Sequence, residues 1–122
     1  MDDATRKELG SESETAALVH LQAHGLRLLA RNYRCKAGEI DLVMLDGATL
    51  ALIEVRYRGN DRFGGPAASV THRKRRRIIA AAGHLLLRRA DLRRYRARFD
   101  VVAISSTHAG RSIEWIRAAF TA

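Results

Sequence analysis

The pattern of apolar and polar residues predicts a helix followed by a strand in the first third of the chain. Between residues 11 and 25 the apolar positions recur at helical spacing. Ser11 and Glu14 fit a capping box at the start of this helix, and Gly25 fits the residue that ends it. The stretch LRLLARNYR, residues 26–34, then predicts a first strand.

The next stretch, GEIDLVMLDGATLALIEVRYR at residues 38–58, predicts a β-hairpin because two apolar runs meet at an Asp-Gly pair. With Asp46 and Gly47 as the two loop residues, Leu45 lies opposite Ala48. Directly paired residues share a face and side chains alternate along a strand, so the charged residues of the hairpin gather on one face. These residues are Glu39, Asp41, Glu54 and Arg56.

Both faces of the predicted hairpin also carry apolar residues. The charged face holds Val43, Leu45, Leu50 and Leu52. The other face holds Ile40, Leu42, Met44, Ala51, Ile53 and Val55. Strands of this kind are usually covered on both sides, so the hairpin is expected to lie between two layers.

The carboxylates on the charged face require a positive charge close to them. Two carboxylates about 5 Å apart at an effective dielectric of about 20 repel one another by roughly 3 kcal/mol. A divalent metal with oxygen ligands would supply the missing charge, and so would Arg56, whose guanidinium can bind a carboxylate through two nitrogens. Both alternatives remain open from the residues alone.

The remaining elements complete an α/β order. Residues 57–70 are rich in glycine and predict a mobile flap, without the Gly-Lys-Ser/Thr of a nucleotide-binding loop. A second helix is expected at residues 71–89 and two further strands at residues 98–104 and 112–116. The order αβββαββ favours an α/β sandwich with a mixed sheet, built as one domain from residues 1–122, of which residues 1–9 are expected to be flexible.

Length and charge limit the classes of function. A chain of 122 residues fits one domain with its own core, and the net charge of +9 favours a polyanionic partner, nucleic acid before a membrane surface. The single cysteine, Cys35, forms no internal disulfide and is interpreted as structural in a reducing cytosol. Without a long apolar run or an apolar signal region, the protein is expected to be soluble and cytoplasmic, with no membrane partner.

The run THRKRRR places five cations in the first turns of the second helix. They are Arg73, Lys74, Arg75, Arg76 and Arg77. Cations at a helix N-terminus oppose the helix dipole, and bound phosphates would offset that cost. Contact with nucleic acid is therefore favoured over a merely solvated basic face.

His20 and His24 stand four residues apart on the first helix, which is a workable spacing for metal ligands. The stretch between them, HLQAH, lacks the glutamate of a zinc-protease helix. The preferred interpretation is an exposed pair without a role.

Several short blocks together resemble the YraN-like family of bacterial proteins, which is related to Holliday-junction resolvases within the restriction-endonuclease-like superfamily. The blocks are Glu14, Gly25, LARNYR at 29–34, GEIDLV at 38–43, EVRYR at 54–58, SVTHRK at 69–74 and RFDVV at 98–102. The likeness spans about residues 10–104, and it implies a restriction-endonuclease-like sandwich.

The resemblance also implies a metal-dependent nuclease site. Asp41 and Glu54 would be ligands of Mg²⁺ or Mn²⁺, with Glu14 as a helix-borne acid beside them. Arg56 stands where the family carries lysine; because arginine cannot lose its proton, it could stabilise charge but not act as a base. Arg56→Lys is therefore expected to raise a weak activity.

The substrate implied by the resemblance is DNA, branched or damaged, and the resolvase relatives imply a homodimer. Arg58, Arg62 and the basic run from Arg73 to Arg77 would follow the phosphate backbone. The alternative is a non-catalytic nucleic-acid-binding or scaffold module in which Arg56 takes the place of the metal.

Overall fold

The computed structural model describes residues 3–58, 70–107 and 110–122. Its elements are α1 (Asp3–Ala23), β1 (Arg27–Cys35), β2 (Gly38–Asp46), β3 (Thr49–Arg58), α2 (His72–Arg88), the 3-10 helix η2 (Ala90–Arg94), β4 (Arg96–Thr107) and β5 (Gly110–Phe120). The predicted order αβββαββ is confirmed. Most of the predicted flap, residues 59–69, lies outside the described residues.

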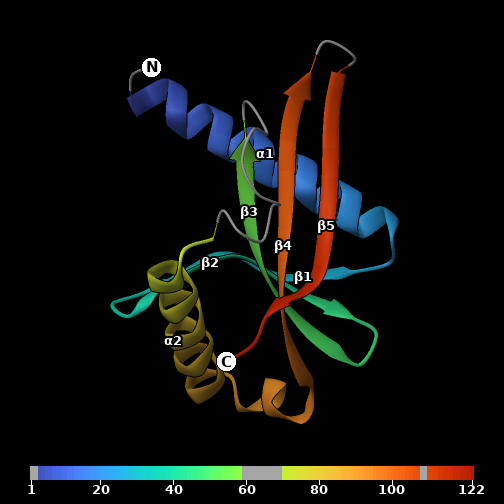
Figure 1. Ribbon diagram of the computed structural model, residues 1–122. Helices are drawn as coiled ribbons and strands as arrows, with labels where there is room; N and C mark the ends of the chain where they lie inside the picture. The colour runs from blue at the N-terminus through green and yellow to red at the C-terminus, as the bar shows by residue number, and fades with distance from the viewer. Residues whose placement is uncertain (1–2, 59–69, 108–109) are drawn as a thin grey trace.

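The strands form one five-stranded mixed sheet in the order β1-β2-β3-β4-β5. Only β3 and β4 run parallel among the neighbouring pairs, and α2 provides the crossover between them. One apolar cluster packs between the sheet and α2, and a second packs between the sheet and α1. Figure 1 shows α1 passing behind β3, β4 and β5 while α2 stands on the other side, the arrangement expected of a restriction-endonuclease-like sandwich.

The two ends of α1 differ in how well the sequence predicts them. Gly25 ends the helix as expected, with φ at 92°. The N–H groups of Gly25 and Leu26 bond the carbonyls of Gln22 and Leu21, a Schellman arrangement. The predicted capping box is wrong, because α1 already begins at Asp3 and Ser11 therefore lies inside the helix.

The β2–β3 hairpin turns one residue later than predicted. Asp46 pairs with Thr49, so that the loop is Gly47-Ala48, and Gly47 takes its first position with φ at 60°. Asp46 remains in the strand, where Arg98 Nη2 of β4 donates to its carboxylate at 2.9 Å. The error displaces every predicted partner by two residues, and a displacement by two does not by itself move any side chain to the other face.

One predicted face assignment is wrong. Ile40 packs in the α2-side cluster, whereas Leu42 packs in the α1-side cluster. In β1, Asn32 lies between Arg31, the partner of Leu42, and Tyr33, the partner of Ile40, and it adopts the left-handed conformation with φ at 56°. The alternation of side chains between the two faces of the sheet is therefore interrupted in both strands, at Asn32 in β1 and at Asp41 opposite it in β2.

The start of α2 lies very close to the β1–β2 turn. Thr71 caps the helix, its Oγ1 accepting from Lys74 N at 3.2 Å. A Cβ atom on Gly38 would lie 2.2 Å from the carbonyl oxygen of Arg77, so only glycine fits this approach. No helix within the described ranges is long and apolar enough to cross a membrane.

Candidate functional site

The central strands part at a position that we call the sheet fork. Pairing of β2 with β3 ends at Leu42 and Ile53, and Figure 1 shows the two strands diverging beyond it. At the fork the Asp41 side chain replaces a backbone acceptor, because Val55 N donates to Asp41 Oδ2 at 2.8 Å. The register continued by one pair sets Asp41 opposite Glu54, and the two carboxyl groups are close enough for each to shift the pKa of the other.

The cation that meets this acid pair comes from α2. Lys74 Nζ lies 2.7 Å from Glu54 Oε1, and the Glu54 side chain is only 2% exposed. Removing Lys74, which is itself partly exposed, would leave the buried Glu54 without its ion-pair partner, which is destabilising. The Lys74–Glu54 contact therefore ties the start of α2 to the sheet fork.

The surroundings of the acid pair disfavour ionisation of both carboxyl groups at once. Burial, and next the charge of Glu54, raise the pKa of Asp41 to about 8, while the Val55 N–H and Lys74 oppose the shift. Burial likewise raises the pKa of Glu54, against the hydrogen bond and charge of Lys74 and the charge of Arg56. At neutral pH the pair therefore retains a proton in the place that a cation could take.

Glu14 approaches the same site from α1. Its charge contributes to the raised pKa of Asp41, after burial and Glu54. Arg31 of β1 holds Glu14, with Nε 3.4 Å from Glu14 Oε1. The Nη2 atom of Arg31 also donates to Ser11 O at 3.1 Å and to Thr15 Oγ1 at 2.9 Å. Arg31 thus holds the face of α1 that carries Glu14 against β1. Glu14 therefore pairs with Arg31 and does not cap the helix as predicted.

Arg56 lies near the acid pair without forming the ion pair that the alternative interpretation assigns to it. Its charge lowers the pKa of Glu54, but the ion pair with Glu54 in the described part of the chain is made by Lys74. The Nε atom of Arg56 is buried and has no hydrogen-bond partner there. A buried donor of this kind requires an acceptor, and a phosphate oxygen or a water molecule would supply one.

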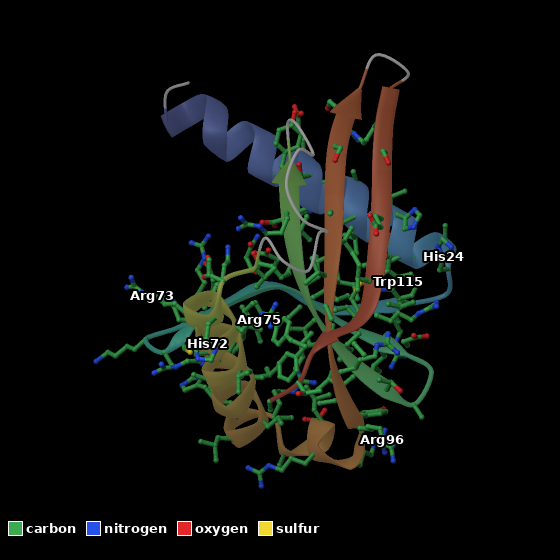
Figure 2. The ribbon with its side chains drawn as sticks, in the orientation of Figure 1. His24, His72, Arg73, Arg75, Arg96 and Trp115 are labelled. Carbon is green, nitrogen blue, oxygen red and sulfur yellow. The ribbon has the colours of Figure 1, made fainter. Side chains whose placement is uncertain are left out.

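The basic run on α2 does not form a single surface. Lys74 points to the acid pair, and Arg75 Nε donates to Val70 O at 3.0 Å while its guanidinium lies 5.5 Å from the Phe120 ring centroid. Arg73, Arg76 and Arg77 line an open groove of about 580 Å³ beside the β1–β2 turn. Figure 2 shows Arg73 on the outer side of α2 and Arg75 on the side toward the sheet.

A second, smaller groove lies at the start of α2, between the basic run and Glu39. Its volume is about 320 Å³, and its lining includes Lys74, Arg73, Arg77 and Glu39. Glu39 also forms an exposed ion pair with Arg34, at 3.3 Å. Glu39 therefore borders the site instead of belonging to the acid pair. Of the other predicted contacts, the side chain of Arg58 and all of Arg62 lie outside the described residues.

The sequence predicts the acid pair but misses the roles of Lys74 and Arg31. Lys74 is the only lysine in the run from Arg73 to Arg77, which is the one signal that sets it apart. Which cation of a basic run turns inward depends on how the helix docks, and spacing alone does not determine that.

The carboxylate oxygens at the fork fit Mg²⁺ better than a metal ion whose ligands must all come from the protein. In the ranges that the structure describes, no three His, Cys, Asp or Glu side chains gather as a metal-binding group. Mg²⁺ is commonly held by one or two carboxylates, with waters and substrate phosphates completing its shell. Asp41 and Glu54, with a proton to release, meet that requirement.

The fold and the fork place the protein in a class, the α/β sandwiches of restriction-endonuclease type with acidic side chains where the central strands part. The chain belongs to the uncharacterised protein family UPF0102, whose model matches residues 13–104. It is 49% identical over 121 residues to a UPF0102 protein of Pseudomonas putida, with 98% of each chain covered. It is 48% identical over 120 residues to a relative from Nitrosococcus oceani, covering 98% of this chain and 97% of the relative. The resemblance to the YraN-like family is confirmed.

Proposed function

We propose that this protein binds nucleic acid, DNA in particular, and hydrolyses its phosphodiester bonds with the help of Mg²⁺ or Mn²⁺. The observation that carries the proposal is the acid pair of half-buried Asp41 and buried Glu54, which holds a proton at neutral pH beside a basic groove. Buried carboxylates with raised pKa values in such a setting are typical of functional sites.

Each side chain at the fork has a distinct task in this proposal. Asp41 and Glu54 would hold the metal, with Glu14 as the third acid nearby. When bound, Mg²⁺ would neutralise the phosphate and make water a stronger nucleophile. The buried Nε of Arg56 would donate to a phosphate oxygen and so orient the scissile group.

Lys74 would supply the site with a lysine from α2 instead of from the strand. Its ammonium group lies 2.7 Å from Glu54 Oε1, which places one positive charge beside the acid pair. The departure of Arg56 from the family pattern therefore does not deprive the site of a lysine.

The basic side chains on α2 give the proposed path of the phosphate backbone. Arg73, Arg76 and Arg77 line the groove by the β1–β2 turn, and Arg58 and Arg62 would extend the contact. By analogy with the resolvase relatives, the substrate would be branched or damaged DNA and the active form a homodimer in the cytoplasm.

The second candidate function is a nucleic-acid-binding module without catalysis. The Lys74–Glu54 contact favours it, because an internal cation already compensates one acid of the pair. The sequence predicts the same module with Arg56 in the place of the metal; in the structure, the cation that pairs with Glu54 is Lys74.

Calorimetric titration of Mg²⁺ and Mn²⁺, with cleavage assays on junction, flap and single-stranded DNA, separates the two functions. The natural protein should bind metal and cut, and Asp41→Asn should lose both activities. Asp91→Asn is the matched control, since Asp91 is an exposed acid paired with Arg89. Lack of metal binding and cleavage by the natural protein would establish the non-catalytic module.

Two substitutions test the cations of the site in the same assays. Lys74→Gln should reduce cleavage without abolishing binding to DNA, since the groove arginines remain. Arg56→Lys restores the family residue, and the prediction that it raises cleavage stands. If Arg56→Lys cuts no better than the natural protein, arginine serves the chemistry as it is.

A further inference from the structure

We propose that His20 and His24, at the end of α1, form a second metal site, which takes a late transition metal ion such as Cu²⁺, Ni²⁺ or Zn²⁺ through two imidazoles. The sequence alone favours no role for this pair. The structure adds its ring geometry, its tautomer and its surroundings, and none of these involves the acid pair at the fork.

The distance between the two rings fits chelation of one ion. Their centroids lie 4.6 Å apart. A metal about 2.0–2.1 Å from an imidazole nitrogen lies about 3.2 Å from the ring centroid, so two rings about 90° apart around it have centroids about 4.5 Å apart. The observed distance between the centroids therefore matches that of two imidazoles at adjacent coordination positions of one ion.

The end of the helix fixes which nitrogen of His24 is available. His24 N bonds Leu21 O at 3.0 Å instead of continuing the α-helical pattern to His20 O. His24 Nδ1 lies 2.8 Å from His20 O, and because a carbonyl only accepts, Nδ1 must donate. The lone pair of His24 is then on Nε2, as in metal-binding histidines whose other nitrogen donates to a backbone carbonyl.

The helix end supports the same conclusion. The carbonyl end of a helix carries partial negative charge, which favours a cation there. Only two protein ligands are present, so water or an external ligand would complete the shell.

Trp115 of β5 lies beside this pair and provides a built-in reporter. Its ring centroid is 5.7 Å from that of His24, and Figure 2 shows the two side chains next to one another at the end of α1. Trp115 Nε1 donates to the buried Asp100 at 3.1 Å, which holds the indole in place. Arg117 stacks 3.8 Å from the indole centroid, and its charge will weaken the binding of any cation. Trp115 is the only tryptophan of the chain.

The experiment is a titration of the full-length protein with CuCl₂, followed by tryptophan fluorescence. Cu²⁺ binds imidazole sites most strongly among these metals and quenches nearby indoles. We expect saturable quenching in the natural protein, with reversal by excess Zn²⁺. His20→Gln and His24→Gln should each weaken the binding at least 10-fold, by analogy with the about 10–100-fold cost of losing even an outer-shell partner.

Two control variants make the outcome specific. His72→Gln, which removes an exposed histidine at the start of α2, should leave the quenching unchanged. Asp41→Asn should also leave it unchanged, so this proposal and the Mg²⁺ proposal fail separately. Quenching that survives the loss of either histidine would show that this histidine is not a ligand of the ion, and quenching lost in Asp41→Asn would assign the metal to the fork; either result overturns the proposal.

Discussion

Asp41 occupies a position that favours its protonated form. Its carboxylate accepts from the Val55 N–H, yet burial and Glu54 raise its pKa to about 8. Ionising it at neutral pH therefore costs free energy that the folded protein must supply. Function and stability are expected to conflict at this residue.

Asp41→Asn should stabilise the metal-free protein, and more so at high pH. The folded-state pKa of Asp41 lies above its unfolded value, so the folded state binds more protons between about pH 4 and pH 8 and stability falls as pH rises through that window. Asparagine keeps an oxygen for Val55 N and does not ionise. We expect a gain of roughly 2–4 kcal/mol at pH 8 and much less at pH 5, measured by urea denaturation.

The matched control for this substitution has the opposite sign. The hydrogen bond from Arg89 lowers the pKa of Asp91, so Asp91→Asn removes a slightly stabilising charge at pH 8. An Asp41→Asn variant whose advantage is the same at pH 5 and pH 8 would contradict the assignment of the raised pKa.

At the scale of residues, the sequence predicts the acid pair although the predicted pairing of β2 with β3 is displaced. Side chains alternate along a strand, so an even displacement does not change the face of a residue. A displacement by two residues keeps Asp41 and Glu54 on one face, although Asp46 stays in the strand. The inward turn of Lys74 and the left-handed conformation of Asn32 depend on tertiary contacts, which no local pattern contains.

At the scale of elements, the contact between α2 and the β1–β2 turn sets the width of the basic groove. Gly38→Ala would place a Cβ 2.2 Å from Arg77 O and 2.8 Å from Arg77 C. Both of these atoms belong to a helix backbone that cannot yield locally. We expect a loss of roughly 1–3 kcal/mol in denaturation experiments, together with weaker DNA binding.

Gly83→Ala is the matched control on the same helix. A Cβ at Gly83 would meet nothing within 4 Å, and alanine is the better helix former. This variant should be more stable by about 0.5–1 kcal/mol, with unchanged DNA binding. Equal effects of the two substitutions would show that the close approach at Gly38 is not maintained in solution.

The elements themselves are predicted well wherever a local signal marks their ends. Gly25 and Thr71 mark helix ends through backbone chemistry that is visible in the sequence. The start of α1 is missed because the charged residues before Ser11 carry no apolar stripe, and Ser11 with Glu14 imitates a cap.

At the scale of the whole molecule, the distribution of cations predicts the salt dependence of DNA binding. The groove presents Arg73, Arg76 and Arg77, whereas Lys74 and Arg75 face inward. If these three arginines neutralise three phosphates, log affinity should fall against log salt with a slope of about −3 on duplex DNA. Arg58 and Arg62 would make the slope steeper.

Two arginines on α2 test which part of the helix meets the DNA. Arg76→Gln should reduce the salt slope by about 1, because one phosphate contact is lost. Arg88→Gln, at the other end of the helix, should leave the slope unchanged. A flat salt dependence of the natural protein, or equal effects of the two variants, would contradict the groove as the binding surface.

The sheet fork also has a consequence for the order in which the chain folds. Asp41 and Glu54 meet through hairpins between neighbouring strands, which close early because little loop entropy is lost. Lys74 reaches them only when α2 docks, so the early hairpins carry carboxylates that repel one another without compensation. Protonation relieves that repulsion, and the natural protein should therefore refold faster at pH 5 than at pH 8 in stopped-flow experiments, whereas Asp41→Asn should lose most of this difference.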